Sequence, residues 1–161
     1  MLVRACRRHG VPLIVNDDVE LALSSDADGV HLGRDDASLP AARSRLGGQR
    51  IIGVSCYNQV ERAVAAQRGG ADYVAFGSMF SSTTKPGAER ADIATLVAAR
   101  TRIHLPIVAI GGITPQNGAS LLEAGVDLLA VVSGVFGHGD PAAGARRYAR
   151  LFAREAMDEE S

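Results

Sequence analysis

Carboxylate side chains follow two short apolar runs of this sequence. Asn16-Asp17-Asp18 comes directly after the run Val11–Val15, and Arg34-Asp35-Asp36 comes after Gly29–Leu32. Aspartates without an adjacent His or Cys are hard oxygen ligands, of the kind that Mg²⁺ takes together with phosphate oxygens. The alternative is that these aspartates cap the helices that follow them. The sequence therefore offers either a magnesium site or helix caps at these positions.

Hydroxyl groups, one lysine and paired glycines occupy further strand ends. The loop Ser81–Lys85 contains the only lysine among the 17 Lys and Arg residues. Hydroxyls, backbone amides and one ammonium group suit a phosphate or pyrophosphate, although an ordinary polar loop has the same composition. At Gly111-Gly112 and Ser133-Gly134 the backbone is open to an anion, and a following helix would add favourable partial charge. These residues indicate a ligand that carries phosphate groups.

Two residues with reactive side chains receive structural interpretations. His31 lies within an apolar run, and it is interpreted as an interior histidine rather than a catalyst. Cys56 follows Ser55 at a strand end, but no accompanying His and Asn pattern supports a thiol nucleophile.

Six apolar runs rich in Val and Ile alternate with Ala- and Leu-rich segments of helical spacing. Continuous apolar runs are typical of parallel strands covered on both faces, so we predict an α/β protein with a parallel sheet. The carboxyl ends of such strands share one edge, which would bring the polar residues together. The strands are predicted at Val11–Val15, Gly29–Leu32, Ile51–Val54, Tyr73–Phe76, Pro106–Ile110 and Leu128–Val132, and the helices at Val19–Ser24, Leu39–Leu46, Gln59–Arg68, Ile93–Thr101, Pro115–Ala124 and about 141–156.

Two architectures accommodate six strand–helix units. A doubly wound open sheet fits the 161 residues comfortably. A (β/α)₈ barrel usually has about 200 residues or more, so this chain would be two units short. Length therefore favours the open sheet, whereas the motifs favour the barrel.

Composition restricts the class of function. A net charge of −1 and 4% aromatic residues provide neither the charge nor the stacking surface typical of a nucleic-acid partner. No apolar run approaches the length of a membrane span, and the first residues lack a secretory signal. Two cysteines, Cys6 and Cys56, are then expected to be reduced thiols. We expect a cytoplasmic protein that acts on small molecules, without nucleic-acid or membrane partners.

The motifs together resemble the thiamine-phosphate synthase family, in order and at family-like spacing over roughly residues 10–140. That family folds as a TIM barrel, so the resemblance implies that the six strands are the third to eighth of a (β/α)₈ barrel. Residues 1–161 would form a single partial domain, with 1–10 ending a preceding helix and 157–161 a frayed tail. The first two strands, with their basic cluster that grips a diphosphate, would be missing. The matching segments are 13–17, 29–36, 52–55, 76–85, 108–115 and 131–133.

The resemblance implies a transferase that joins hydroxymethylpyrimidine diphosphate to a thiazole phosphate, giving thiamine phosphate and pyrophosphate. Asp17 and Asp36 would bind the cofactor Mg²⁺, and Asn16 would hold the aminopyrimidine. Ser55 and Lys85, the candidate catalytic residues, would hold the pyrophosphate. The other substrate-binding residues would be Ser82, Thr83, Thr84, Gly112, Val132 and Ser133.

The implied chemistry needs neither a nucleophilic side chain nor a strong base. Pyrophosphate departure would leave a cation that the electron-rich aminopyrimidine stabilises, so ionisation precedes attack by the thiazole nitrogen. Two alternatives remain open: a non-catalytic phosphate-ligand binder and a thiazole tautomerase, whose functional histidine is replaced here by Ser78. The open edges of a six-stranded barrel would also allow pairing with another chain, as in a homo-oligomer.

Overall fold

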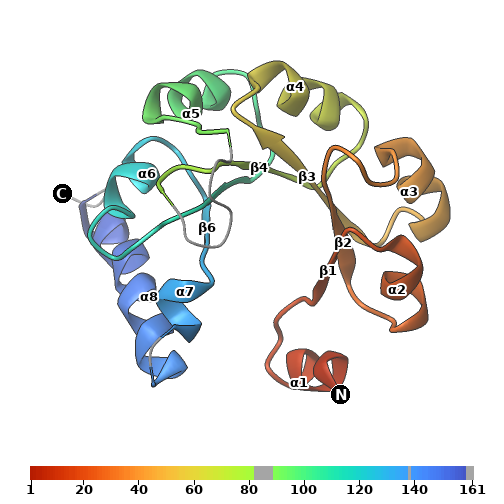
Figure 1. The fold of residues 1–161 in the computed structure, drawn as a ribbon, viewed down its shortest axis with the longest axis horizontal. Coiled ribbons are helices and arrows are strands. Elements are labelled where there is room, and N and C mark those ends of the chain that lie inside the picture. Colours follow the sequence, from red (N-terminus) through yellow and green to blue (C-terminus); the bar gives the residue numbers. More distant parts are fainter. Residues whose placement is uncertain (82–88, 138, 159–161) are drawn as a thin grey trace.

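The computed structural model describes residues 1–81, 89–137 and 139–158. Its six strands form one sheet in the order β1-β2-β3-β4-β5-β6, and every neighbouring pair is parallel. The sheet curls, and the helices lie along its outer side (Figure 1). The strands are β1 (Ile14–Asn16), β2 (Gly29–Leu32), β3 (Ile51–Tyr57), β4 (Tyr73–Phe76), β5 (Ile107–Ile110) and β6 (Leu128–Ala130).

Chain order equals spatial order in this sheet, which decides between the two predicted architectures. A doubly wound sheet reverses its strand order at a switch point and carries helices on both faces. Here there is no reversal among the described strands, so the fold is barrel-like and the length-based preference for an open doubly wound sheet is wrong. The helices are α1 (Leu2–Arg8), α2 (Val19–Ser24), α3 (Leu39–Leu46), α4 (Val60–Arg68), α5 (Ile93–Arg100), α6 (Ala119–Glu123), α7 (Ser133–Phe136) and α8 (Pro141–Asp158).

The helix predicted at Pro115–Ala124 is shorter than expected. Helix α6 begins only at Ala119, after a turn at residues 115–117 and a bend at Gly118. The amide side chain of Asn117 explains the difference, because its Oδ1 accepts from Thr114 N at 2.8 Å and its Nδ2 donates to Gly112 O at 3.2 Å. These side-chain bonds compete with the first helical turn.

Side chains alternate between the two faces of the strands. Ile52, Val54 and Phe76 face the helices and are buried. The intervening positions carry Gly, His, Ser and Tyr, and they face the concave side of the curled sheet. The outer face therefore supplies the hydrophobic core. The concave face carries polar and small residues on β2 to β4, and apolar residues such as Val108 and Ile110 on β5.

At three places along the sheet, an aspartate that precedes one strand accepts a hydrogen bond from a backbone amide in the preceding strand or directly before it. Each carboxylate lies at the amino edge, where it fixes the register of the two strands and leaves the opposite edge for ligands. The three contacts are Asp28 Oδ2 with Leu13 N at 2.8 Å, Asp72 Oδ2 with Ile52 N at 2.7 Å and Asp127 Oδ2 with Ile107 N at 2.7 Å.

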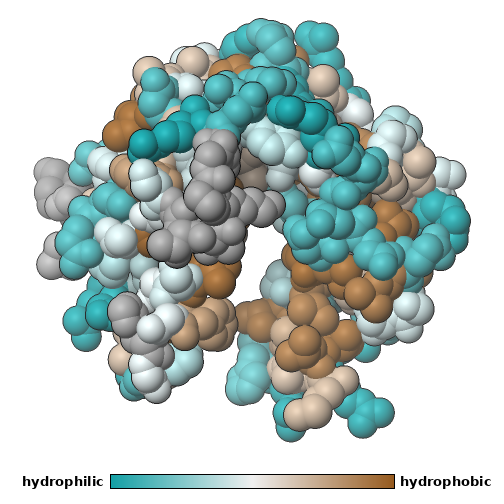
Figure 2. Space-filling model, in the orientation of Figure 1, coloured by the Kyte–Doolittle hydropathy of each residue, from teal (hydrophilic) through white to brown (hydrophobic). Residues whose placement is uncertain are grey.

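The sheet has two edges, because among the described strands β1 pairs only with β2 and β6 only with β5. Figure 2 shows apolar surface on both sides of the opening between these ends of the sheet. Val11, beside β1, and Leu128, on β6, are about half exposed. In the described part of the chain, no helix is both long and apolar enough to cross a membrane.

Candidate functional site

Four residues form one row across the concave face of β1 to β4. Asn16 pairs with His31, His31 with Gly53, and Gly53 with Tyr73. Neighbours in register on parallel strands point to the same side, so all four face the interior of the curl. The glycine is required here, because a Cβ at Gly53 would lie 1.9 Å from Tyr73 Cζ. The Tyr73 ring thus occupies the space above β3 and reaches His31.

His31 makes hydrogen-bond contacts through both ring nitrogens. Its Nδ1 lies 2.9 Å from the hydroxyl of Tyr73, and its Nε2 lies 2.8 Å from Ser55 Oγ. The His31 and Tyr73 rings are stacked, with centroids 5.5 Å apart. Burial lowers the pKa of His31, and the negative charge of Asp36 opposes that shift in part. The interpretation of His31 as an interior residue agrees with its place in the structure, but its two hydroxyl partners were not predicted.

The two aspartates after β1 have different roles. Asp18 Oδ1 accepts from Leu21 N at 2.9 Å and caps α2, so the helix-cap alternative is confirmed for this residue. Asp17 has φ of 68°, and the amide that follows it bonds to Asn16 O at 2.9 Å, which makes a γ-turn. This turn leaves Asp17 exposed at the carboxyl end of β1. Its amide bonds to His31 O at 2.8 Å, which ties the turn to β2.

Asp36 lies at the carboxyl end of the next strand and does not cap a helix. Helix α3 is capped by Ser38, whereas Asp36 Oδ2 accepts from Gly33 N at 2.5 Å. That bond holds the half-buried carboxylate over the end of β2. No group of three or more His, Cys, Asp or Glu that could hold a metal occurs within the described ranges. Asp17 and Asp36 are thus carboxylates at adjacent strand ends, a donor set compatible with a cation that also binds phosphate oxygens.

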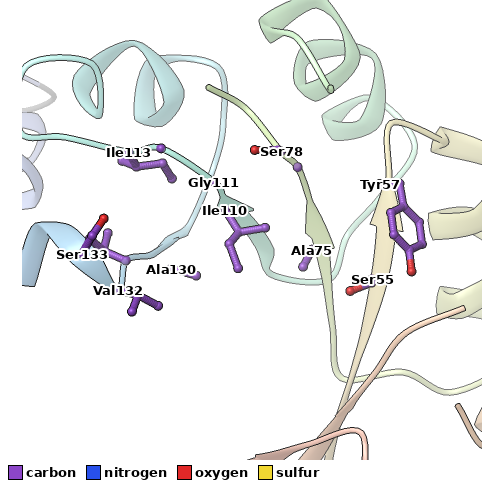
Figure 3. A pocket seen from close by; sticks show the side chains of 13 residues that line it. Ser55, Tyr57, Ala75, Ser78, Ile110, Gly111, Ile113, Ala130, Val132 and Ser133 are labelled. Atoms are coloured by element: carbon purple, nitrogen blue, oxygen red, sulfur yellow. The ribbon is translucent and has the colours of Figure 1, made fainter. Parts of the chain in front are cut away.

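A cavity of about 320 Å³ opens at the carboxyl ends of β3 to β6. Four predicted site residues line it: Ser55, Gly112, Val132 and Ser133. Figure 3 shows Ser55 on one side and Val132 with Ser133 on the other, with Ile110 and Ala130 between them. The cavity therefore has a largely apolar floor and hydroxyl groups at opposite ends.

The wall beside Gly111 and Gly112 is built by the segment after β4. Phe80 N bonds to Gly111 O at 3.0 Å, and Ser78 Oγ donates to Phe80 O at 2.8 Å. Gly111 and Gly112 have positive φ, and a Cβ on Gly112 would lie 2.4 Å from Ser81 O. Only glycine fits both requirements here. The predicted residues Ser82, Thr83, Thr84 and Lys85 lie outside the described residues.

The comparisons with known proteins agree with this geometry. The family model described as thiamine monophosphate synthase matches residues 1–135. The chain belongs to the thiamine monophosphate synthase family. It is 57% identical to "Thiamine-phosphate synthase" of Aromatoleum aromaticum, over 91% of this chain and 71% of that protein. It is also 57% identical to the protein of that name from Azoarcus sp. (strain BH72), over 94% of this chain and 74% of that protein.

A solved structure of a similar protein shares the fold. The structure titled "Thiamine phosphate pyrophosphorylase from Pyrococcus furiosus" superposes with a TM-score of 0.87 at 33% identity, covering 95% of this chain and 73% of that chain. The resemblance to the thiamine-phosphate synthase family is thus confirmed, and so is the barrel-like fold. The assignment of individual site residues remains a prediction.

In this member of the family, the structure adds site residues that sequence reasoning missed. Tyr57 lines the cavity, and its hydroxyl accepts from Arg34 N at 3.1 Å. The Arg34 guanidinium lies 4.5 Å from the centre of the Tyr57 ring. Arg62 joins two strand ends, donating to Ser55 O at 2.7 Å and Gly33 O at 3.2 Å. The position of Tyr57, two residues after Ser55 on the same strand, could have identified it from the sequence. The contacts of Arg34 and Arg62 could not be predicted, because they depend on the tertiary structure.

Proposed function

We propose that this chain catalyses the formation of thiamine phosphate and pyrophosphate from hydroxymethylpyrimidine diphosphate and a thiazole phosphate. The observation that carries the proposal is the cavity at the carboxyl edge, which brings Ser55 of β3 together with Gly112, Val132 and Ser133, from the segments that follow β5 and β6. These residues are up to 78 positions apart in the sequence, yet they line one space. The named relatives at 57% identity support the same reaction.

The cavity suits the thiazole phosphate. Its floor of Ile110, Ala130 and Val132 would accept the apolar ring, and Gly112 with Ser133 would meet the phosphate through backbone and hydroxyl donors. Ser55, at the other end, would face the diphosphate of the pyrimidine substrate. This arrangement would hold the thiazole nitrogen in line with the carbon that loses pyrophosphate.

Asp17 and Asp36 would hold Mg²⁺ at the ends of β1 and β2. The Gly33 amide donates to Asp36 Oδ2. This hydrogen bond orients the carboxylate so that its other oxygen, Oδ1, could bind the cation. When bound, Mg²⁺ would neutralise charge on the diphosphate as it becomes a leaving group. Asn16 precedes Asp17 on the same strand end and would bind the aminopyrimidine.

The chain's own side chains would bind and orient the substrates rather than attack them. Ser55 and Lys85 would donate to the departing pyrophosphate, which favours ionisation before the thiazole nitrogen attacks. Cys56 is not a competing nucleophile, because it is buried and burial raises the pKa of its thiol to about 12. We also propose that the six strands are the third to eighth of the family's eight-stranded barrel, which agrees with the two edges at which the described sheet pairs with no further strand.

Turnover by the purified chain tests the proposal directly. With both substrates and Mg²⁺, chromatography should detect thiamine phosphate, and a coupled assay should detect one pyrophosphate per product. Asp17→Asn and Asp36→Asn should each lower turnover strongly and raise the Mg²⁺ concentration required. Asp35→Asn, a neighbouring exposed carboxylate, is the matched control and should change neither.

Two results would contradict parts of the proposal. Unchanged Mg²⁺ dependence in both variants would remove Asp17 and Asp36 from the metal site. Binding of thiazole phosphate without turnover, and without Mg²⁺-dependent binding of the pyrimidine diphosphate, would establish the non-catalytic binder instead. Calorimetry with each substrate separately distinguishes these results.

A further inference from the structure

The hydroxyls of Tyr73 and Ser55 lie on opposite sides of the His31 ring. This arrangement connects Ser55 to two residues that do not themselves line the cavity. Tyr73 Oη is 2.9 Å from Nδ1, and Ser55 Oγ is 2.8 Å from Nε2. Only Ser55 lines the cavity; His31 and Tyr73 lie behind it on β2 and β4. The three side chains thus form a continuous hydrogen-bonded chain that ends at the ligand space.

We propose that Tyr73 and His31 are positioning residues, which orient the Ser55 hydroxyl so that its proton points at an anionic ligand in the cavity. Tyr73 O–H donates to Nδ1, Nε2–H donates to Ser55 Oγ, and Ser55 O–H donates to the ligand. No proton is transferred, because each donor keeps its hydrogen. The identity of that ligand as the departing diphosphate rests on the proposed function.

The direction of the chain follows from the chemistry of its members. A neutral imidazole has one donor and one acceptor nitrogen, so the partner of one nitrogen determines the role of the other. The phenol O–H of Tyr73 is more acidic than the alcohol O–H of Ser55, so it is the stronger donor to an unprotonated nitrogen. Tyr73 also keeps its proton, since burial raises its pKa to about 12. Nδ1 therefore accepts, and Nε2 carries the hydrogen. Ser55 Oγ then accepts a hydrogen bond from His31 Nε2–H, so its own hydroxyl hydrogen can point into the cavity.

The packing around His31 keeps the ring in this orientation. The Tyr73 ring stacks on it at an interplanar angle of 23°, and Gly53 leaves the space in which that ring lies. Burial lowers the pKa of His31, and the negative charge of Asp36 opposes that shift in part. A neutral ring has a defined tautomer, which can be measured.

Nitrogen-15 NMR of the histidine rings tests the direction without any substrate. The signal that disappears in His31→Asn identifies the residue, and it should report hydrogen on Nε2 and none on Nδ1. Hydrogen on Nδ1 would overturn the proposal. Tyr73→Phe should shift the ring toward a mixture of tautomers, and an unchanged spectrum would count against Tyr73 as the residue that selects the tautomer.

Amide substitutions separate the two nitrogens of His31. Gln places its amide near Nε2 and can still donate to Ser55, whereas Asn places its amide near Nδ1 and cannot reach the serine. His31→Asn should lower kcat/KM roughly tenfold, as expected for one lost hydrogen bond to a charged ligand. His31→Gln should recover part of that loss. Equal losses in the two variants would contradict action through Ser55. His104→Asn, the same change at an exposed histidine, is the control.

A double-mutant cycle tests whether His31 acts through Ser55. In a Ser55→Ala background, adding His31→Asn should change kcat/KM by less than about twofold. A second tenfold loss would show that His31 has a merely structural role. The same cycle can be run on Mg²⁺–pyrophosphate affinity by calorimetry. If the chain makes no thiamine phosphate but this coupling between His31 and Ser55 persists, the proposed function fails and the positioning role stands. If the chain is active but the two residues are not coupled, the proposed function stands and the positioning role fails.

Discussion

Gly53→Ala should destabilise the fold specifically through the ring of Tyr73. The new Cβ would lie 1.9 Å from Cζ and 2.4 Å from both Cε atoms, and these are its three nearest contacts. To restore ordinary contact the ring must retreat by about 1.5 Å, which breaks its hydrogen bond to His31. Overpacking costs about 1–3 kcal/mol and the lost bond about 1 kcal/mol, so the free energy of unfolding should fall by about 2–4 kcal/mol.

Urea denaturation followed by circular dichroism measures this loss, and a second background isolates its cause. In Tyr73→Ala the obstructing ring is gone, and Gly53 has no positive φ that an alanine would strain. There Gly53→Ala should be neutral or stabilising by up to about 1 kcal/mol, because alanine restricts the unfolded chain. Gly48→Ala is the matched control, since a Cβ at Gly48 meets nothing within 4 Å. Equal destabilisation by Gly53→Ala in both backgrounds would refute the argument.

Three further predictions concern His31, Tyr148 and Lys85. Below about pH 6.5 the free energy of unfolding should fall, because the lowered pKa of His31 lets the unfolded chain bind a proton that the folded chain does not. The slope of the free energy of unfolding against pH should be flatter in His31→Asn, and an identical slope would contradict this. Tyr148→Phe should cost about 1–2 kcal/mol in a urea titration, since the buried hydroxyl donates to Ile113 O at 3.0 Å, and a change under 0.3 kcal/mol would show that bond to be dispensable. Lys85→Ala should lower kcat/KM by a factor equivalent to about 2 kcal/mol or more, and wild-type kinetics would exclude Lys85 from transition-state stabilisation.

Local pattern was enough to locate most of the elements. The apolar runs Gly29–Leu32 and Tyr73–Phe76 are β2 and β4 with the same bounds, because a buried parallel strand needs a continuous apolar segment between turn residues. The helices Val19–Ser24 and Leu39–Leu46 also match. The pattern failed after β5, where one asparagine side chain bonds to the backbone and delays α6 by a turn.

The sequence by itself determined the family and the strand ends at which polar residues gather, since both depend on residue types in order along the chain. Tertiary structure alone decided which of these residues meet. It assigned Asp18 to a helix cap and Asp36 to the end of β2, two roles that one residue type can fill. It also joined His31, Gly53 and Tyr73 into one row. The register of three strands sets those contacts, and register is a property of the whole sheet, which no single segment encodes.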